Sequence, residues 1–146
     1  MRYKNILVPL DGSNTAEVAL PHAFALARLS GAEVMLLLVV PPVEPLVQAD
    51  KPVIDEQWPA RKARVIEYLN SLSERADCEG LTLQSAVESG PPAETILEFA
   101  AKRSIDLIVM ATHGHSGMKR WLLGSVAEKV LRAADRPVLL IRAFAE

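Results

Sequence analysis

Runs of apolar residues alternate with amphipathic stretches along the whole chain. Four runs are apolar in almost every position: 5–8, 34–40, 105–110 and 138–141. Such runs are typical of parallel strands that are buried on both faces of a sheet. The stretches between them carry apolar residues at helical spacing. One example is the series Ala93, Ile96, Leu97, Ala100 and Ala101.

A further run, 81–87, alternates only partly and predicts an outer strand with one wetter face. The order is therefore strand then helix, repeated four times, followed by a last strand. This alternation predicts an α/β fold, with a five-stranded parallel sheet covered by helices on both faces. A chain of 146 residues fits one Rossmann-like domain over residues 1–146.

Several residues predict where helices begin, break or end. Asn14 followed by Glu17 resembles a capping box, so the first helix is expected to begin there. Pro21 lies inside its apolar pattern and predicts a kink or local break, because an interior proline costs roughly 3 kcal/mol. Residues 41–59 contain five prolines and predict a long, exposed, mobile loop. A second helix is expected over about 55–80.

Charge and composition exclude some classes of function. The formal net charge is −2, so no basic footprint indicates nucleic-acid binding. The longest apolar stretch, 34–40, is too short to span a membrane, and the N-terminal segment becomes polar too early for a secretory signal. Cys78 is the only cysteine, so no intrachain disulfide can form. Together these features predict a cytoplasmic protein that binds neither nucleic acid nor membrane.

Residues 111–126 connect a predicted strand to a predicted helix and hold three of the seven glycines. A helix that starts at Gly124 and Ser125 would direct its unpaired N–H groups and the positive end of its dipole into this turn. Phosphate groups bind at such helix N-termini. The two best-known phosphate motifs, GxxxxGK[ST] and GxGxxG, are absent. A tight turn without a ligand therefore remains the alternative.

Three segments of the chain are expected to meet at one edge of the sheet. In parallel sheets, ligands bind beyond the carboxyl ends of the strands, where the strand order reverses. Asp11 follows the first predicted strand, Val39 ends the second, and residues 111–114 follow the fourth. If the first and fourth strands are neighbours, these segments form one crevice. The sequence therefore predicts a small-molecule site there.

The glycine-rich connection also holds basic and imidazole side chains. His113 and His115 have no carboxylate or cysteine at metal-ligand spacing, so no protein metal site is predicted. His115 is a candidate phosphate contact, whereas His113 is interpreted as a packing residue. Lys119 and Arg120 either steer phosphates or are simply solvated. No catalytic residue is assigned, because the crevice offers phosphate donors but no evident general base.

Several segments resemble the universal stress protein family. The chain reads KNILVPLDGS near its start, DLIVMATHG at the fourth predicted strand, LLGSVAEKVLR after the connection and RPVLLIR near its end. The nucleotide-binding branch of the family carries G-x2-G-x9-G-[ST] after its fourth strand. Here Gly114, Gly124 and Ser125 match this pattern, and Ala111 replaces its first glycine.

The resemblance implies a sheet of order 3-2-1-4-5 and a site for ATP, with Mg²⁺ held through the phosphates. By position, Asp11 would hold the sugar or the adenosine end, the Val39 backbone would meet the adenine edge, and Ala111 would lie by the ribose. The phosphates would be cradled by Gly114, Gly124, Ser125 and Val126. The full set of candidate ATP-binding residues is Pro9, Leu10, Asp11, Ser13, Val39, Met110, Ala111, Gly114, His115, Gly124, Ser125 and Val126.

The strand order has a consequence for assembly. It places the last strand at an edge of the sheet, where the apolar residues 138–141 would leave backbone groups unpaired. The family pairs this strand with its twin across a two-fold axis. The resemblance therefore implies a homodimer through Pro137, Val138, Leu139, Leu140, Ile141 and Arg142.

The sequence supports three functional hypotheses. The first is an ATP-binding, nucleotide-dependent stress-response or signalling dimer that is not an enzyme beyond slow ATP hydrolysis. The second is a nucleotide-free dimeric interaction module of the same fold, which Ala111 favours. The third, ranked below both, is an adenine-nucleotide-hydrolysing α/β enzyme, whose usual SGGxDS or HIGH motif is absent near the first strand. The protein partner and the stress signal stay open.

Overall fold

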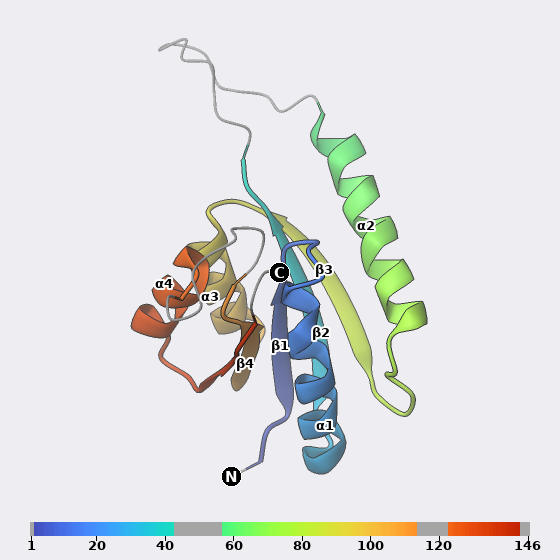
Figure 1. Cartoon of the computed structure of the whole chain (residues 1–146), viewed down its shortest axis with the longest axis vertical. Coiled ribbons are helices and arrows are strands. Elements are labelled where there is room, and N and C mark those ends of the chain that lie inside the picture. The colour runs from blue at the N-terminus through green and yellow to red at the C-terminus, as the bar shows by residue number, and fades with distance from the viewer. Residues whose placement is uncertain (1, 43–56, 114–122, 144–146) are drawn as a thin grey trace.

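Five parallel strands form the centre of the protein in the computed structural model (Figure 1). The structure describes residues 2–42, 57–113 and 123–143. The strands are β1 (Asn5–Leu10), β2 (Glu33–Val40), β3 (Leu83–Ser89), β4 (Leu107–Ala111) and β5 (Val138–Ile141). Their order is β3-β2-β1-β4-β5, which confirms the predicted fold class and strand order.

The position of each strand in the sheet agrees with how far its side chains are buried. β1, β2 and β4 are buried along most of their length, whereas the edge strands β3 and β5 have mostly half-buried and exposed residues. In β1, Ile6 and Val8 join the core on one face of the sheet and Leu7 joins the core on the other. All three are fully buried. Because successive side chains of a strand point to opposite faces, this strand needs cover on both.

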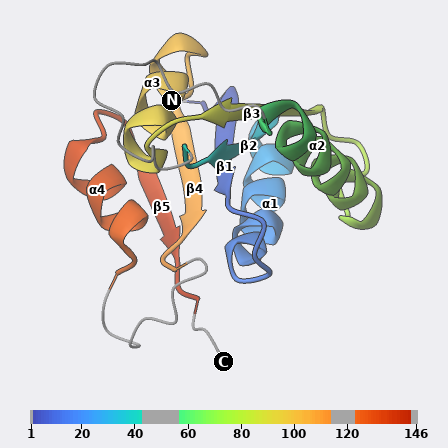
Figure 2. The ribbon, with the colours of Figure 1, turned by 90° about the horizontal axis from the view of Figure 1, so that it is seen from above.

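Helices supply that cover on the two faces of the sheet (Figure 2). They are the 3₁₀ helix η1 (Ala16–Ala19) and the α-helices α1 (Leu20–Ser30), α2 (Trp58–Arg75), α3 (Pro92–Lys102) and α4 (Ser125–Ala133). α1 and α2 pack over a core that contains Phe24 and Leu72. α3 and α4 pack over a separate core that contains Ile96 and Val130.

The predicted capping box at the start of the first helix is wrong. Thr15 is the N-cap of η1 and makes no side-chain cap bond. The hydroxyl of Ser13 instead accepts a hydrogen bond from the N–H of Ala16 at 3.1 Å. The carboxylate of Glu17 is engaged by side chains of α2, so it is not available to cap its own helix.

Three helices, α1, α2 and α3, have a proline in the first turn, where proline is tolerated. Pro21 is in the first turn of α1, after η1 has ended, so the predicted local break is the junction of the two helices. Pro59 is likewise in the first turn of α2. α2 spans Trp58–Arg75, so the predicted bounds of 55–80 were too wide at both ends and the predicted loop 41–59 included two helical residues. Residues 43–56 lie outside the described residues.

Glu17 joins η1 to α2 through two side chains. The Tyr68 hydroxyl donates to its Oε2 at 2.7 Å, and the Arg75 guanidinium donates to both carboxylate oxygens at 2.8 and 3.2 Å. The bond from Arg75 lowers the pKa of Glu17 below its ordinary value of 4.5, although burial acts in the opposite direction. Burial and the bond to Glu17 raise the pKa of Tyr68, so its phenol stays a donor.

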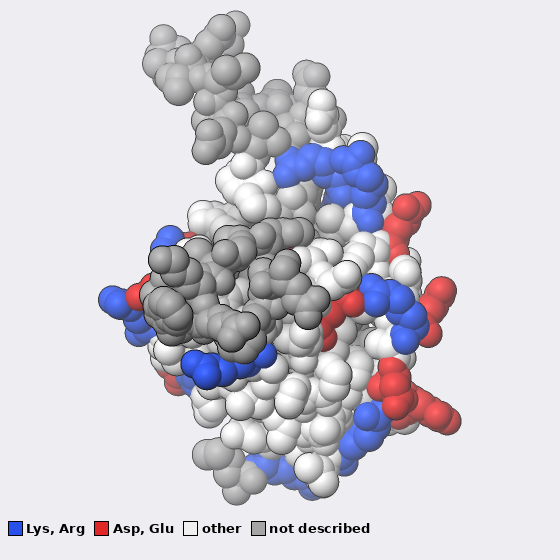
Figure 3. All heavy atoms as spheres, in the orientation of Figure 1, with Lys and Arg blue, Asp and Glu red and all other residues white. Residues whose placement is uncertain are grey.

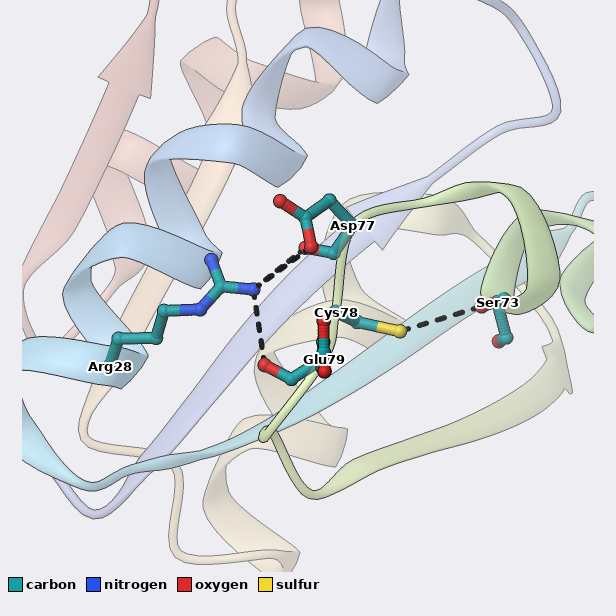
Figure 4. A network of polar contacts seen from close by, with 5 residues as sticks. All are labelled: Arg28, Ser73, Asp77, Cys78 and Glu79. Atoms are coloured by element: carbon teal, nitrogen blue, oxygen red, sulfur yellow. Dashed lines mark hydrogen bonds and ion pairs between the residues drawn. The ribbon is translucent and has the colours of Figure 1, made fainter.

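A second set of contacts joins α1 to the connection between α2 and β3 (Figure 4). Nη2 of Arg28 donates to the carbonyl oxygens of Asp77 and Glu79 at 3.0 and 3.3 Å. The thiol of Cys78 is half-buried and lies 3.4 Å from the carbonyl oxygen of Ser73. These contacts hold the turn that leads into β3 against α1.

Two observations concern membrane spans and nucleic-acid binding, which the composition argued against. None of the helices in the described ranges is long and apolar enough to cross a membrane. On the face shown in Figure 3, basic side chains lie among acidic ones. That mixture differs from the single-sign basic patch of a nucleic-acid-binding face.

We predict that the Glu17 contacts stabilise the fold at neutral pH and lose this effect in acid. A carboxyl whose pKa is lowered by folding contributes stability above its unfolded pKa, here near 4.5, and loses it as the pH falls through the folded-state pKa. Glu17→Gln should therefore lower the urea midpoint at pH 7. Its difference from the wild type should shrink steadily between pH 5 and pH 3.

The matched control is Glu128→Gln, which removes the carboxylate of an exposed pair with Arg132. Such exposed pairs contribute little, so this variant should unfold almost as the wild type does at every pH. If Glu17→Gln and the wild type differed in urea midpoint by the same amount at pH 7 and pH 3, the charged Glu17 carboxylate would not be the source of the stabilisation.

Candidate functional site

A pocket of about 470 Å³ opens at the carboxyl ends of β1, β2 and β4. β2 and β4 flank β1 on its two sides, so the pocket lies where the strand order reverses. The predicted site residues that line it are Pro9, Leu10, Asp11, Val39, Met110, Ala111, Gly124, Ser125 and Val126. The crevice predicted from the sequence is therefore present. Gly114 and His115 lie outside the described residues, as do Lys119 and Arg120.

Ser13, another predicted site residue, is not in the pocket wall but holds Asp11, which is. Oδ1 of Asp11 accepts hydrogen bonds from the backbone N–H and the hydroxyl of Ser13, at 2.9 and 2.5 Å. The same hydroxyl receives the N–H of Ala16. Gly12, between the two residues, has a φ of +88°, a conformation that glycine adopts readily. The first turn after β1 therefore fixes the carboxylate at the pocket.

Gly124 brings the start of α4 against the end of β4. Its N–H donates to the carbonyl oxygen of Thr112 at 2.7 Å. A Cβ placed on Gly124 would lie 2.7 Å from that oxygen and 3.4 Å from the Cα of His113. Because φ at Gly124 is −63°, glycine is needed here for the close approach of two backbones and not for an unusual dihedral angle.

The first turn of α4 opens into the pocket. Gly124 is the N-cap and makes no side-chain cap bond, and Ser125, Val126 and Ala127 all line the cavity. N–H groups in the first turn of a helix have no acceptor within the helix, and the helix dipole places partial positive charge there. This end of the pocket therefore suits an anion.

Much of the remaining wall is apolar and comes from three elements. β2 contributes Leu38, Val39 and Val40, α2 contributes Val65 and α3 contributes Ile96. The sequence analysis placed Ile96 on an apolar helix face, and neither Ile96 nor Val65 was among the predicted site residues. Helical periodicity is a local signal, whereas the approach of these side chains to the strand ends depends on how the helices cross the sheet.

Ala111, which replaces a glycine of the family pattern, fits its position without strain. It is the last residue of β4 and pairs with Ile141 of β5. Ser104 is the only non-glycine residue with a positive φ in the described ranges, so the backbone at Ala111 does not need glycine. Ala111 is buried and lines the pocket.

His113 is buried, as expected of a packing residue, with 4% of its surface exposed. Its Nδ1 lies 2.8 Å from the carbonyl oxygen of Ala143 and 3.0 Å from Oγ1 of Thr112. The N–H of Ala143 donates to the same Oγ1 at 3.2 Å. These contacts tie the chain after β5 to the end of β4. Thr112 and His113 both line the pocket, and neither was among the predicted site residues.

The ionisable groups of the pocket are few. Asp11 and His113 are the only ionisable side chains among its described lining residues. The described ranges contain no group of three or more His, Cys, Asp or Glu that could hold a metal ion. The pocket thus combines an end that suits an anion, one fixed carboxylate and an apolar wall.

Comparison with known proteins assigns the chain to a family. A model of the universal stress protein family matches residues 2–142. The chain belongs to the universal stress protein family. Universal stress protein MJ0531 of Methanocaldococcus jannaschii is 38% identical to it over 144 residues, which cover 96% of this chain and 82% of the relative.

Solved structures of other universal stress proteins share the fold. UspA of Lactobacillus plantarum superposes with a TM-score of 0.83 at 30% identity, over 97% of this chain and 99% of that one. A universal stress protein solved in complex with cAMP has a TM-score of 0.73 over 98% of this chain and 99% of that one. Its identity is 23%, so this second likeness shows the fold alone.

In this universal stress protein the described residues of the family motif lie on two elements, β4 and α4, that meet at the pocket. Gly124 and Ser125 begin α4 and line the pocket. Ala111 belongs to β4, and Gly114 lies outside the described residues. Ala111, Gly124 and Ser125 are therefore the motif positions that the described part of the chain brings to the pocket.

Proposed function

We propose that this universal stress protein binds an adenine nucleotide, ATP with Mg²⁺, and that occupancy of the site serves a stress-response or signalling role. The observation that carries the proposal is the N-terminus of α4, which opens into a pocket with a fixed carboxylate and an apolar wall. The volume of about 470 Å³ lies within the range typical of small-molecule sites. One family member has been solved with cAMP, an adenine nucleotide.

Three parts of the pocket match three parts of the nucleotide. The first-turn N–H groups at Ser125 and Val126 would donate to phosphate oxygens. The Asp11 carboxylate would accept hydrogen bonds from the ribose hydroxyls. β2 extends to Val40, but its pairing with β1 ends at Leu38. Beyond Leu38, the backbone groups on the β1 side of β2 would be available to the edge of the adenine ring.

The metal ion would depend on the nucleotide. Mg²⁺ binds phosphate oxygens and water readily and needs few protein ligands. The described residues offer no cluster of acids for it, so phosphates would supply its main ligands. The chain's own contribution is to orient those phosphates at α4.

We predict that a negative charge at Ser125 blocks nucleotide binding. Ser125 is exposed in the first turn of α4. Ser125→Asp places a carboxylate where it favours the helix and repels phosphate. Ser125→Asn is the neutral control. In calorimetric titrations with Mg·ATP we expect micromolar binding by the wild type and by the Asn variant. The Asp variant should bind at least about tenfold more weakly, a loss of about 1.4 kcal/mol.

Ser125 is a better position than Gly124 for testing the effect of charge, because Gly124→Asp would add a steric clash with the Thr112 carbonyl oxygen to the effect of the charge. Equal binding by the Asp and Asn variants would contradict a phosphate site at α4. A folded wild type that is free of copurified nucleotide and binds neither ATP nor cAMP would support the nucleotide-free interaction module instead. Tighter binding of cAMP than of ATP would change the assigned nucleotide and leave the site in place.

We expect at most slow ATP hydrolysis. Phosphoryl transfer needs an aligned nucleophile and groups that neutralise developing charge, and the described pocket wall has only Asp11 and His113 as ionisable side chains. Phosphate release at saturating Mg·ATP should therefore be far below 1 s⁻¹. Turnover of about 1–100 s⁻¹, the range of dedicated kinases, would favour the enzyme hypothesis.

We also propose a homodimer formed through β5. This strand is at the edge of the sheet, and Leu139 within it is 37% exposed. An apolar edge strand readily pairs with a second chain. The proposed contact comprises Pro137, Val138, Leu139, Leu140, Ile141 and Arg142. A cytoplasmic location is compatible with a nucleotide ligand and stays a prediction.

Leu139→Lys should shift the protein from dimer to monomer, because a charged side chain on an edge strand opposes pairing. Sedimentation at micromolar concentration measures the change. The matched control is Leu29→Lys, which replaces a leucine that is 84% exposed on α1 and should remain dimeric. A monomeric wild type, or a Leu139→Lys variant that stays dimeric, would rule out this interface.

A further inference from the structure

The first half of α2 forms one side of the pocket but packs weakly against the rest of the protein. None of residues 58–68 is buried, whereas Leu69 and Leu72 in the second half are. The shorter helices α1 and α3 each bury four side chains. The first turns of α2 extend past the carboxyl ends of the strands (Figure 1). A segment with few buried apolar contacts opens at a low cost in free energy.

Polar contacts hold this half of the helix against the pocket. The Tyr68 hydroxyl donates to Glu17 of η1 at 2.7 Å. Nη2 of Arg61 donates to the carbonyl oxygen of Pro41 at 2.9 Å. Pro41 lines the pocket, and so does the first residue of η1. Between these two contacts Val65 is half-buried and lines the pocket. The helix is therefore joined to two sides of the opening by bonds that can break without exposing a large apolar surface.

The second half of α2 supplies a fixed anchor. Leu69 and Leu72 are each 1% exposed and belong to the core beneath α1. Arg75 donates to both carboxylate oxygens of Glu17, so it still joins α2 to η1 when the bond from Tyr68 is broken. The change from weak to firm packing falls between Tyr68 and Leu69. Movement of the first half would therefore open the pocket and leave the sheet and its core intact.

We propose that residues 58–68 of α2 are a lid over the pocket, latched by the hydrogen bond from Tyr68 to Glu17 and anchored at Leu69 and Leu72. When the lid opens, Val65 leaves the pocket wall and a ligand enters from the side of α2. Lids of this kind move in microseconds to milliseconds. The lid is a property of the ligand-free chain, and its effect on nucleotide exchange rests on the proposed function.

Relaxation-dispersion NMR of the ligand-free protein tests the lid itself, because it detects motion on this timescale. The backbone amides of residues 60–68 should share one exchange rate and one open population, and those of α3 should show neither. Tyr68→Phe keeps the ring and removes the latch. It should raise the open population about tenfold, as expected for loss of a hydrogen bond to a charged group. The matched control is Tyr3→Phe, whose lost hydroxyl has no hydrogen-bond partner in the described ranges, and it should behave as the wild type does.

Stopped-flow binding of a fluorescent ATP analogue with Mg²⁺ tests the gating of the pocket. A latch affects entry and exit alike, so Tyr68→Phe should raise the association and dissociation rate constants by about the same tenfold and leave Kd almost unchanged. A variant that only raises the dissociation rate would show that Tyr68 positions the site and does not gate it.

The two measurements separate the lid from the nucleotide. Exchange rates that differ from residue to residue and decline along α2 from its first turn would show simple end fraying and overturn the lid. Dispersion that is absent from residues 60–68 in both the wild type and Tyr68→Phe would do the same. A wild type that binds no nucleotide but shows the common exchange would overturn the proposed function and leave the lid standing.

Discussion

The burial of β1 on both faces is the constraint on which the site depends. Ile6, Leu7 and Val8 are fully buried, so the strand needs neighbours along both edges and helices over both faces. α1, the helix after β1, covers one face of the sheet, and α4, the helix after β4, covers the other. Because these two helices lie on opposite faces, a gap opens between them at the carboxyl ends of the strands. The pocket is a consequence of how the central strand is covered.

The approach of α4 to β4 gives that gap its chemistry. The 2.7 Å hydrogen bond from Gly124 to Thr112 sets the start of the helix beside the strand end, and the absent side chain of Gly124 makes the distance possible. The first turn of α4 therefore lies beside the end of β4, and both line the pocket. One backbone contact thus brings the helix dipole and the first-turn N–H groups to the pocket, where they suit a phosphate.

The acidic part of the pocket is held from the opposite side of the sheet. Asp11 is bonded to Ser13, which caps the start of η1, and Glu17 of η1 is bonded to α2. α2 in turn contributes Val65 to the apolar wall. The Asp11 carboxylate and part of the apolar wall are therefore both positioned by the contact between η1 and α2. The ion pair in that contact, between Glu17 and Arg75, requires Glu17 to be charged.

The sequence by itself determined the α/β class, the position of the site at the strand ends and the helix start at Gly124 and Ser125. These follow from apolar periodicity and turn chemistry, which act over a few neighbouring residues. The tertiary structure alone decided that Glu17 binds α2 instead of capping its own helix, that Val65 and Ile96 reach the pocket, and that Nε2 of His113 has no hydrogen-bond partner among the described residues. Each of these depends on the distance between segments far apart in the chain, and no local pattern encodes such a distance.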